Sequence, residues 1–364
     1  MFRSKRSFIS KIHLDWPLLI GIILISALGI IILYSAKPET DVIQKQGFRL
    51  MLACGVMVFI AQIPPRFFSG IAPWLYGIAL VMLISVLVMG HISKGGQRWL
   101  DLWFVRFQPA ELMKLAVPLM VAKYFNDNTL PPKASMLFMP LAFILIPVLL
   151  IAKQPDLGTA LLILSSGLLV IFFSGISWKI LFSLASLVTL CLPPLWFFMR
   201  DYQRQRVLVL LDPERDPLGS GYQIIQSKIA IGSGGLYGKG WLNGTQSNLE
   251  FLPERTTDFI FAVFSEEFGL VGCLILLLLY LYIIIRGIYI SVQAQNTFGR
   301  LLAGSLVMTL FVYVFVNIGM VTGILPVVGI PLPLVSYGGT SLVTLMASFG
   351  ILMSIHTHRT LLAK

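Results

Sequence analysis

Four carboxylates and one arginine lie in the stretch LPERTTDFIFAVFSEEFG, residues 252–269, directly before a strongly apolar run. Asp258 is followed by FIFAVF, so its side chain must emerge from a partly apolar surround. There, burial and nearby cations shift the affinity of a carboxylate for protons in opposite directions, which suits a tunable proton acceptor. Asp258 is predicted to share a helical face with Glu254, four residues earlier. Glu266 and Glu267 begin the next apolar segment and are interpreted as helix-start and packing residues, because acids are favoured in the first helical turn.

A second group of polar residues, Gln108, Glu111 and Lys114, lies in the stretch FQPAELMK. A spacing of three places them along one face of a helix, so Glu111 can reach Lys114. Pro109 suits the first helical position, which predicts that a helix starts here. The purely structural interpretation is that Glu111 is an acid at the helix start and that the charge of Lys114 neutralises it. A lone ammonium one turn inside an apolar run is costly, however, so Lys114 needs a partner and an inward direction, and this favours a functional site.

The segment IAKQPDLGTALL sets Gln154, Asp156 and Thr159 at a turn between two apolar runs. Asp156 can cap the helix that follows the turn. It can equally be the charge partner of Lys114, and the sequence leaves both interpretations open.

Positive charge collects in two segments between apolar runs. In HISKGGQRWLDLWFVRF, residues 91–107, three cations including Arg98 and Arg106 oppose one acid. In the second segment, Lys228 precedes and Lys239 lies within the glycine-rich stretch IGSGGLYGKGWLNGTQ. This stretch matches neither a nucleotide phosphate loop nor a dinucleotide fingerprint, because required glycines are replaced. The cations predict a site for an anion such as a phosphate or pyrophosphate, with anionic outer-leaflet lipid and an irregular loop as the alternatives.

The composition indicates the kind of fold that must position these residues. Of 364 residues, 57% are apolar and 12% are charged, which fits an all-α polytopic membrane protein and excludes a soluble multidomain protein. A span needs about 20 mainly apolar residues. Ten spans are predicted, at residues 16–35, 48–63, 73–90, 108–125, 136–152, 157–174, 178–199, 268–290, 301–324 and 339–356. The three cysteines fall inside apolar runs without paired spacing and are interpreted as packing residues. A single membrane domain, 1–364, is the economical interpretation.

The distribution of cations predicts the orientation of the spans. A cluster of cations precedes the first span, which places an N-terminal tail, residues 1–15, in the cytoplasm. That span is interpreted as retained rather than as a signal peptide, because no convincing small-residue cleavage site follows it. Ten spans return the C-terminal tail, residues 357–364, to the cytoplasm. The polar segments that then face outside are 91–107, 153–156, 325–338 and one long loop between the seventh and eighth spans, 200–258.

Three stretches, taken together, resemble the SEDS family of cell-wall polymerases (shape, elongation, division, sporulation). They are GIPLPLVSYGGTS at 329–341, LPERTTDFIFAVFSEEFG at 252–269 and RWLDLWFVRFQPAELMK at 98–114. The resemblance covers essentially the whole chain. The long outer loop carries GSGG and GKG where division-type (FtsW) members tend to carry GxGE and GQG, so the chain is more similar to elongation-type (RodA) members.

The resemblance implies a ten-span SEDS fold and a peptidoglycan glycosyltransferase that polymerises lipid II during cell elongation and rod-shape maintenance. It implies a bacterial inner-membrane protein whose site faces the periplasm, working with a class B penicillin-binding protein and the elongation machinery. The family's proposed catalytic aspartate lies in the motif LPExxxDFIFA, and that position here is Asp258. The expected substrate-binding residues are Arg98, Arg106, Gln108, Glu111, Lys114, Asp156, Lys228 and Lys239.

The chemistry of this substrate class predicts how such residues would be used. Asp258 is the hypothesised general base, which deprotonates the acceptor 4-hydroxyl as that oxygen attacks the anomeric carbon of the donor with inversion. One carboxylate suffices, because the departing undecaprenyl pyrophosphate needs charge stabilisation more than protonation. A Mg²⁺ or Mn²⁺ ion could bridge the pyrophosphate, but no ligand cluster in the sequence demands a metal.

Two rival functions are open at this stage. A ten-span protein with buried charges could flip lipid II across the membrane instead of polymerising it, or could serve only as a scaffold for a partner enzyme. Transporters commonly show paired repeats and interrupted helices near the bilayer midplane. The polar residues here concentrate at the outer mouth instead, which favours chemistry on the outside, and a scaffold has no need for Lys114 inside a span.

Overall fold

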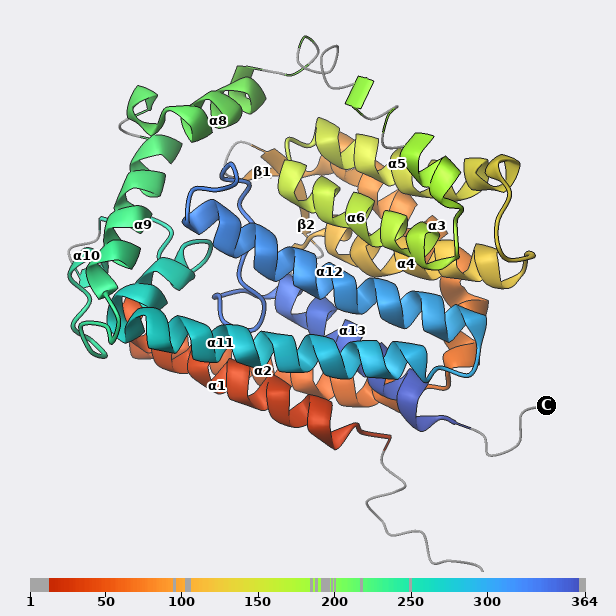
Figure 1. The fold of residues 1–364 in the computed structure, drawn as a ribbon, viewed down its shortest axis with the longest axis horizontal. Coiled ribbons are helices and arrows are strands. Elements are labelled where there is room, and N and C mark those ends of the chain that lie inside the picture. Colours follow the sequence, from red (N-terminus) through yellow and green to blue (C-terminus); the bar gives the residue numbers. More distant parts are fainter. Residues whose placement is uncertain are drawn as a thin grey trace, which may run out of the picture.

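The long helices form an elongated bundle in a computed structural model of the chain (Figure 1). The structure describes residues 13–93, 96–101, 106–183, 201–216, 219–248 and 251–359, with single positions at 186, 189, 190, 197 and 199. The helices of the bundle are α1 (Trp16–Ala36), α2 (Thr40–Ala61), α3 (Pro65–Met89), α4 (Pro109–Asn126), α5 (Phe138–Lys153), α6 (Leu157–Phe173), α11 (Ile260–Val292), α12 (Thr297–Val321) and α13 (Thr340–Thr357). The all-α polytopic membrane fold that the composition predicts is confirmed.

The helices can be compared directly with the ten predicted spans. Seven described helices are long and apolar enough to cross a membrane. The helix α6 is shorter, with 17 residues, and α4 has 18 residues that include two lysines and a glutamate. The predicted span 178–199 includes positions outside the described residues, so it remains a prediction; residues 178–183 are helical.

Local sequence explains where several helices begin. The Asp15 carboxylate accepts a hydrogen bond from the Leu18 N–H at 2.9 Å and caps α1. Pro109 occupies the first position of α4, as predicted. Asp156 caps α6 by accepting from the Thr159 N–H at 3.2 Å, which confirms one of its two interpretations.

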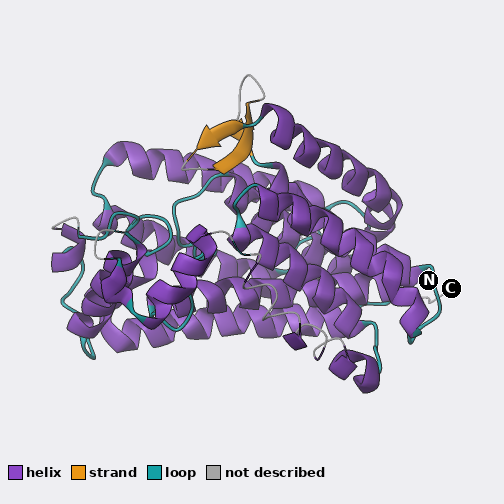
Figure 2. Ribbon diagram, turned by 90° about the horizontal axis from the view of Figure 1, so that it is seen from above, coloured by secondary structure: helices purple, strands orange, loops and turns teal. Residues whose placement is uncertain are grey.

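Two of the predicted outer loops contain regular structure. Residues 91–107 include three short antiparallel strands, β1 (His91–Ser93), β2 (Gly96–Asp101) and β3 (Arg106–Phe107), which project from the helices (Figure 2). Trp99 lies in β2, and aromatic residues are enriched in strands. The predicted loop 200–258 contains α8 (Asp201–Leu211), α9 (Ser220–Gly234) and α10 (Thr245–Asn248). The short 3₁₀ segments Ala134–Leu137 and Pro213–Arg215 complete the described elements.

The two ends of the bundle contain different elements. The helices α8, α9 and α10 gather at one end, together with the start of α11 (Figure 1). The start of α1 and the end of α13 lie at the opposite end. There the Asp15 carboxylate bonds Arg286 of α11 at 2.7 Å and the His356 ring of α13 at 2.7 Å. Burial raises the pKa of Asp15, but hydrogen bonds from His356, Arg286 and the Leu18 N–H outweigh it and hold that pKa well below its usual range.

Candidate functional site

Two stretches far apart in the sequence meet at Asp258. The loop 329–337 between α12 and α13 bonds the turn 252–259 before α11. The Tyr337 N–H donates to the Thr256 carbonyl at 2.9 Å, and the Ser336 hydroxyl donates to the Thr257 carbonyl at 2.5 Å. Two hydrogen bonds therefore join the loop to the turn, at the end of the bundle where α11 begins.

The carboxylate of Asp258 faces this junction. Its side chain is half-buried, and a Cβ at Gly329 would lie 3.5 Å from Oδ2. Gly329 has a φ of +76°, a conformation that favours glycine. The predicted helical face shared by Glu254 and Asp258 is wrong, because residues 253–259 form turns and α11 begins only at Ile260.

The predicted pairing of Glu111 with Lys114 is confirmed. The Lys114 ammonium lies 2.7 Å from the Glu111 carboxylate, and both side chains are buried, at 8% and 5% exposed. The ammonium also lies over the ring of Tyr313 on α12, 5.2 Å from the ring centre. The second Glu111 oxygen, Oε2, has no hydrogen-bond partner among the described residues. A buried charge pair with an unsatisfied oxygen is costly for folding alone, which fits a functional use.

The second interpretation of Asp156, as the charge partner of Lys114, is wrong. Its carboxylate accepts from the Gln108 amide at 3.0 Å and lies 4.0 Å from Nε of Arg98. Arg98 also donates to the carbonyls of Gln154 and Pro155, at 3.4 and 2.5 Å. Strand β2 is thereby fixed to the turn between α5 and α6. The backbone of Arg106 pairs in β3, but its side chain lies outside the described residues.

Lys228 and Lys239, the two cations singled out in the predicted outer loop 200–258, have different surroundings. Lys228 on α9 is exposed and lies over Gly323, where its Nζ would be 2.8 Å from an added Cβ. Gly323 follows the end of α12, and the carbonyl end of a helix favours a cation. Lys239 instead donates to the Glu266 carboxylate and to the Thr245 hydroxyl, each at 2.7 Å.

The acids Glu266 and Glu267 hold the glycine-rich stretch in place. Their interpretation as helix-start residues is wrong, because α11 begins at Ile260 and both lie just before non-helical Gly269. The Glu266 carboxylate accepts from the Thr245 N–H at 2.9 Å, and Glu267 accepts from the Ser35 hydroxyl of α1. Sequence reasoning missed this role because the lysine that completes it is 27 residues away.

We expect Lys239→Met to loosen the stretch 235–248. The substitution removes the ammonium from the fully buried carboxylate of Glu266, and a hydrogen bond to a charged group contributes about 1.5–3 kcal/mol. Limited proteolysis and hydrogen exchange of this stretch measure the effect. Lys228→Met is the matched control, because it removes a cation from the neighbouring α9 that does not bind Glu266. Equal protection of the stretch in both variants contradicts the assignment.

Helix α12 and the residues just after it contact three of the groups described above, those of Lys114, Asp258 and Lys228. Tyr313 contacts the Lys114 ammonium, Asn317 bonds the backbone carbonyl of Asp258 at 2.9 Å, and Gly323 underlies Lys228. Tyr313 and Asn317 are one turn apart on the same face, a rise of about 6 Å. The Lys114 pair, the Asp258 turn and Lys228 thus follow one another along the last third of α12 and the residues just after its end.

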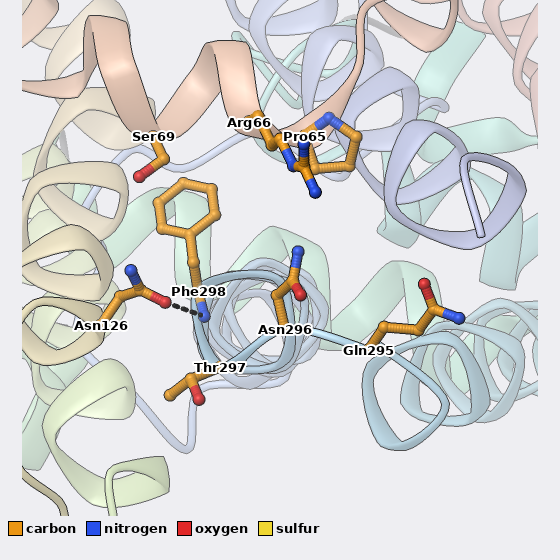
Figure 3. Close-up of a pocket in the computed structure, with 8 residues that line it drawn as sticks. All are labelled: Pro65, Arg66, Ser69, Asn126, Gln295, Asn296, Thr297 and Phe298. Atoms are coloured by element: carbon orange, nitrogen blue, oxygen red, sulfur yellow. Dashed lines mark hydrogen bonds between the residues drawn. The ribbon is translucent and has the colours of Figure 1, made fainter. Parts of the chain in front are cut away.

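A pocket of about 400 Å³ lies at the other end of α12 (Figure 3). It lies between Arg66 and Ser69 of α3, the end of α4 and the residues around the start of α12, where the Phe298 N–H donates to the Asn126 side-chain oxygen at 3.2 Å. Asn317 is 20 residues along α12 from Thr297, about 30 Å of helix. This pocket is therefore separate from the Asp258 site.

Two residues near Asp258 are not distinguished in the sequence predictions. Asn317 is a single amide inside the apolar span α12, and it is fully buried. Arg49 of α2 stacks over the ring of Tyr337, 4.6 Å from the ring centre. Each is a polar residue inside a predicted apolar run, which is the signal that could have identified it.

Comparisons with known proteins show the family of the chain. Residues 11–361 match the model of the FtsW/RodA/SpoVE family, described as cell cycle proteins. Peptidoglycan glycosyltransferase MrdB of Escherichia coli K12 is 57% identical over 363 residues, which cover 99% of this chain and 98% of that protein. A probable peptidoglycan glycosyltransferase FtsW of Geobacter metallireducens is 35% identical, over 94% of each chain.

Solved structures give the same result. A chain from work on a peptidoglycan synthase complex that coordinates polymerisation and crosslinking matches with a TM-score of 0.83 and 36% identity, over 94% of this chain and 97% of that one. The crystal structure of the rod shape determining protein RodA of Thermus thermophilus matches with a TM-score of 0.72 and 31% identity, over 94% and 96% of the two chains. Sequence and fold together lead to one conclusion: the chain belongs to the FtsW/RodA/SpoVE family, the SEDS family of multi-pass membrane proteins.

Proposed function

We propose that this chain is a peptidoglycan glycosyltransferase that polymerises lipid II into glycan strands and releases undecaprenyl pyrophosphate. The observation that carries the proposal is the 57% identity to MrdB of E. coli over almost the full length of both proteins. The junction of two family-like stretches at the half-buried Asp258 supports an active site at the end of the bundle that holds α8 to α10.

The proposed mechanism uses Asp258 as general base. Its carboxylate accepts the proton of the acceptor 4-hydroxyl while that oxygen forms a bond to the anomeric carbon of the donor. The bond from that carbon to the pyrophosphate oxygen breaks in the same displacement, which inverts the configuration. Fixing the base within the junction of loop and turn supports this role, because a general base must be held within hydrogen-bond reach of its proton.

The cations are proposed to stabilise the departing pyrophosphate, with Lys228 foremost among the described ones. Lys228 is exposed on α9, and its ammonium lies over Gly323, just after the end of α12, the helix whose Asn317 bonds the Asp258 turn. Arg98 and Lys239 are proposed to act mainly by shaping the site, because each is bonded to a carboxylate or to carbonyls of the chain. Gln108, Glu111, Lys114 and Asp156 are proposed to line the substrate-binding region.

A divalent cation, Mg²⁺ or Mn²⁺, is a separate proposal. Among the described residues, no group of three or more His, Cys, Asp or Glu side chains could hold a metal ion. Such an ion would be carried to the site by the oxygens of the pyrophosphate itself. Adding EDTA to the polymerisation assay tests this, and undiminished turnover would remove the metal from the mechanism.

The proposed setting is the bacterial inner membrane, with both termini in the cytoplasm and the site in the periplasm. The proposed partner is a class B penicillin-binding protein of the elongation machinery. The match to a chain from a peptidoglycan synthase complex supports a partner of this kind.

Gel analysis of products from purified lipid II tests the proposed function. The purified chain, with its class B penicillin-binding protein, is expected to form glycan strands. Transfer of lipid II across vesicle membranes without any polymer would favour a flippase and overturn the proposal. Polymer that depends on the partner alone would assign the chain a scaffold role.

A further inference from the structure

The backbone that carries Asp258 is held by three donors from distant parts of the chain. The carbonyls of Thr256, Thr257 and Asp258 are consecutive, and each accepts one hydrogen bond. The donors are the Tyr337 N–H at 2.9 Å, the Ser336 hydroxyl at 2.5 Å and the Asn317 side-chain amide at 2.9 Å. We call these three bonds the carbonyl clamp.

Asn317 makes the bond nearest to the proposed base and also reaches a second carbonyl. Its Nδ2 donates to the Asp258 carbonyl at 2.9 Å and to the Ile330 carbonyl at 2.7 Å. Because both partners are acceptors, the amide nitrogen must face them, and its two hydrogens serve one carbonyl each. One side chain therefore joins the Asp258 turn, α12 and the loop 329–337.

Asn317 would destabilise the fold if its side chain served packing alone. It is fully buried in an apolar span, and its Oδ1 has no hydrogen-bond partner among the described residues. A buried acceptor without a donor destabilises a fold, because nothing replaces the hydrogen bonds that it makes to water. A requirement for the position of the Asp258 backbone explains why this cost is tolerated, since local rules are most often broken at functional sites.

We infer that Asn317 is a positioning residue for the proposed reaction and that the carbonyl clamp, completed by Ser336, sets the direction of the Asp258 carboxylate. The inference rests on the proposed function. The side chain of Asn317 acts on the backbone of Asp258, which in turn directs the carboxylate toward the acceptor hydroxyl. Since a displacement of about 1 Å can reduce turnover about 10²-fold, loss of the clamp affects kcat more than substrate binding.

Turnover of lipid II by Asn317→Leu and Asn317→Asp, each purified with the partner, tests the inference. Both substitutions nearly keep the volume of the side chain and remove the amide group, so neither variant can donate to both carbonyls at once. We expect kcat to fall about 10- to 100-fold while KM for lipid II changes little. The acidic limb of the pH–rate profile should also move, because a redirected carboxylate has different surroundings. Ser336→Ala, which removes the donor to Thr257, should lower kcat in the same direction.

Ser305→Ala is the matched control for a purely structural effect. Ser305 lies on the same helix, is also fully buried, and donates to the Ser166 carbonyl at 2.7 Å, three turns from Asn317. Its loss should lower thermal stability but leave kcat and the pH–rate profile unchanged.

The possible outcomes separate this inference from the proposed function. Absence of polymer from the parent protein would overturn the proposed function. An active parent whose folded Asn317 variants keep full kcat and an unmoved pH profile would overturn the positioning role alone. If neither Asn317 variant folds, Ser336→Ala decides, and an unchanged kcat in that variant would overturn the clamp.

Discussion

Asp258→Asn is expected to reduce glycan-strand formation from purified lipid II by about 10²- to 10⁴-fold, the range typical of a lost general base. The amide has nearly the shape of the carboxylate but cannot accept the proton. The Asp258 carbonyl would still accept from Asn317 at 2.9 Å, so the turn should keep its position. Expression and binding of the penicillin-binding protein should therefore remain at the parent level, and the loss should appear in kcat.

Asp212→Asn provides the control for this experiment. Asp212 lies in the same predicted loop, 200–258, but between α8 and α9, where it is exposed and its carboxylate bonds Arg215 at 3.0 Å. An exposed ion pair of this kind contributes about 0–1 kcal/mol, so both stability and turnover should be unchanged. Normal polymerisation by the Asp258→Asn variant would remove Asp258 from the mechanism.

Lys114→Met is expected to give the largest loss of stability among single substitutions at the site. The change leaves the Glu111 carboxylate buried, at 5% exposed, without the ammonium that lies 2.7 Å away. Breaking a buried ion pair from one side costs about 3–5 kcal/mol, because the remaining charge is uncompensated. Thermal unfolding in detergent measures this loss. Lys123→Met on the same helix is the control, because its pair with Asp127 is partly exposed.

The double substitution Glu111→Gln, Lys114→Met separates folding from chemistry. With both charges removed, the buried region is neutral, and most of the lost stability should return. Turnover should not return if the Lys114 ammonium contributes to substrate binding. A double variant with parent turnover would remove both residues from the site, and a stable Lys114→Met variant would contradict the buried pair.

The features that the sequence predicted well are local. The start of α4 follows from Pro109 alone. The pair of Glu111 with Lys114 and the cap of Asp156 on the Thr159 N–H each join residues three positions apart. Helix geometry alone fixes the distance between such residues. Nine of the ten predicted spans overlap described helices, because a bilayer requires long apolar segments, but α2, α3 and α11 each begin eight residues before the predicted start.

The prediction that Glu266 and Glu267 begin a helix is wrong because the apolar pattern does not fix where that helix starts. The run FIFAVF before Glu266 lies outside the predicted span 268–290, whereas it forms the first turns of α11. The two acids consequently lie inside the helix, just before Gly269. Their partners, Lys239 and Ser35, lie on other parts of the chain, so the apolar pattern could not show what the carboxylates bind.

By itself, the sequence determined the membrane class, most of the helices, the short-range pairs and, through resemblance, the family and the proposed base. Only the tertiary structure decided which distant residues surround that base. Asn317 and Asp258 are 59 positions apart, and Ser336 and Thr257 are 79 apart. No periodicity of a helix relates such positions. Their contact depends on how α12 and the loop 329–337 pack against the start of α11, and that packing makes the carbonyl clamp.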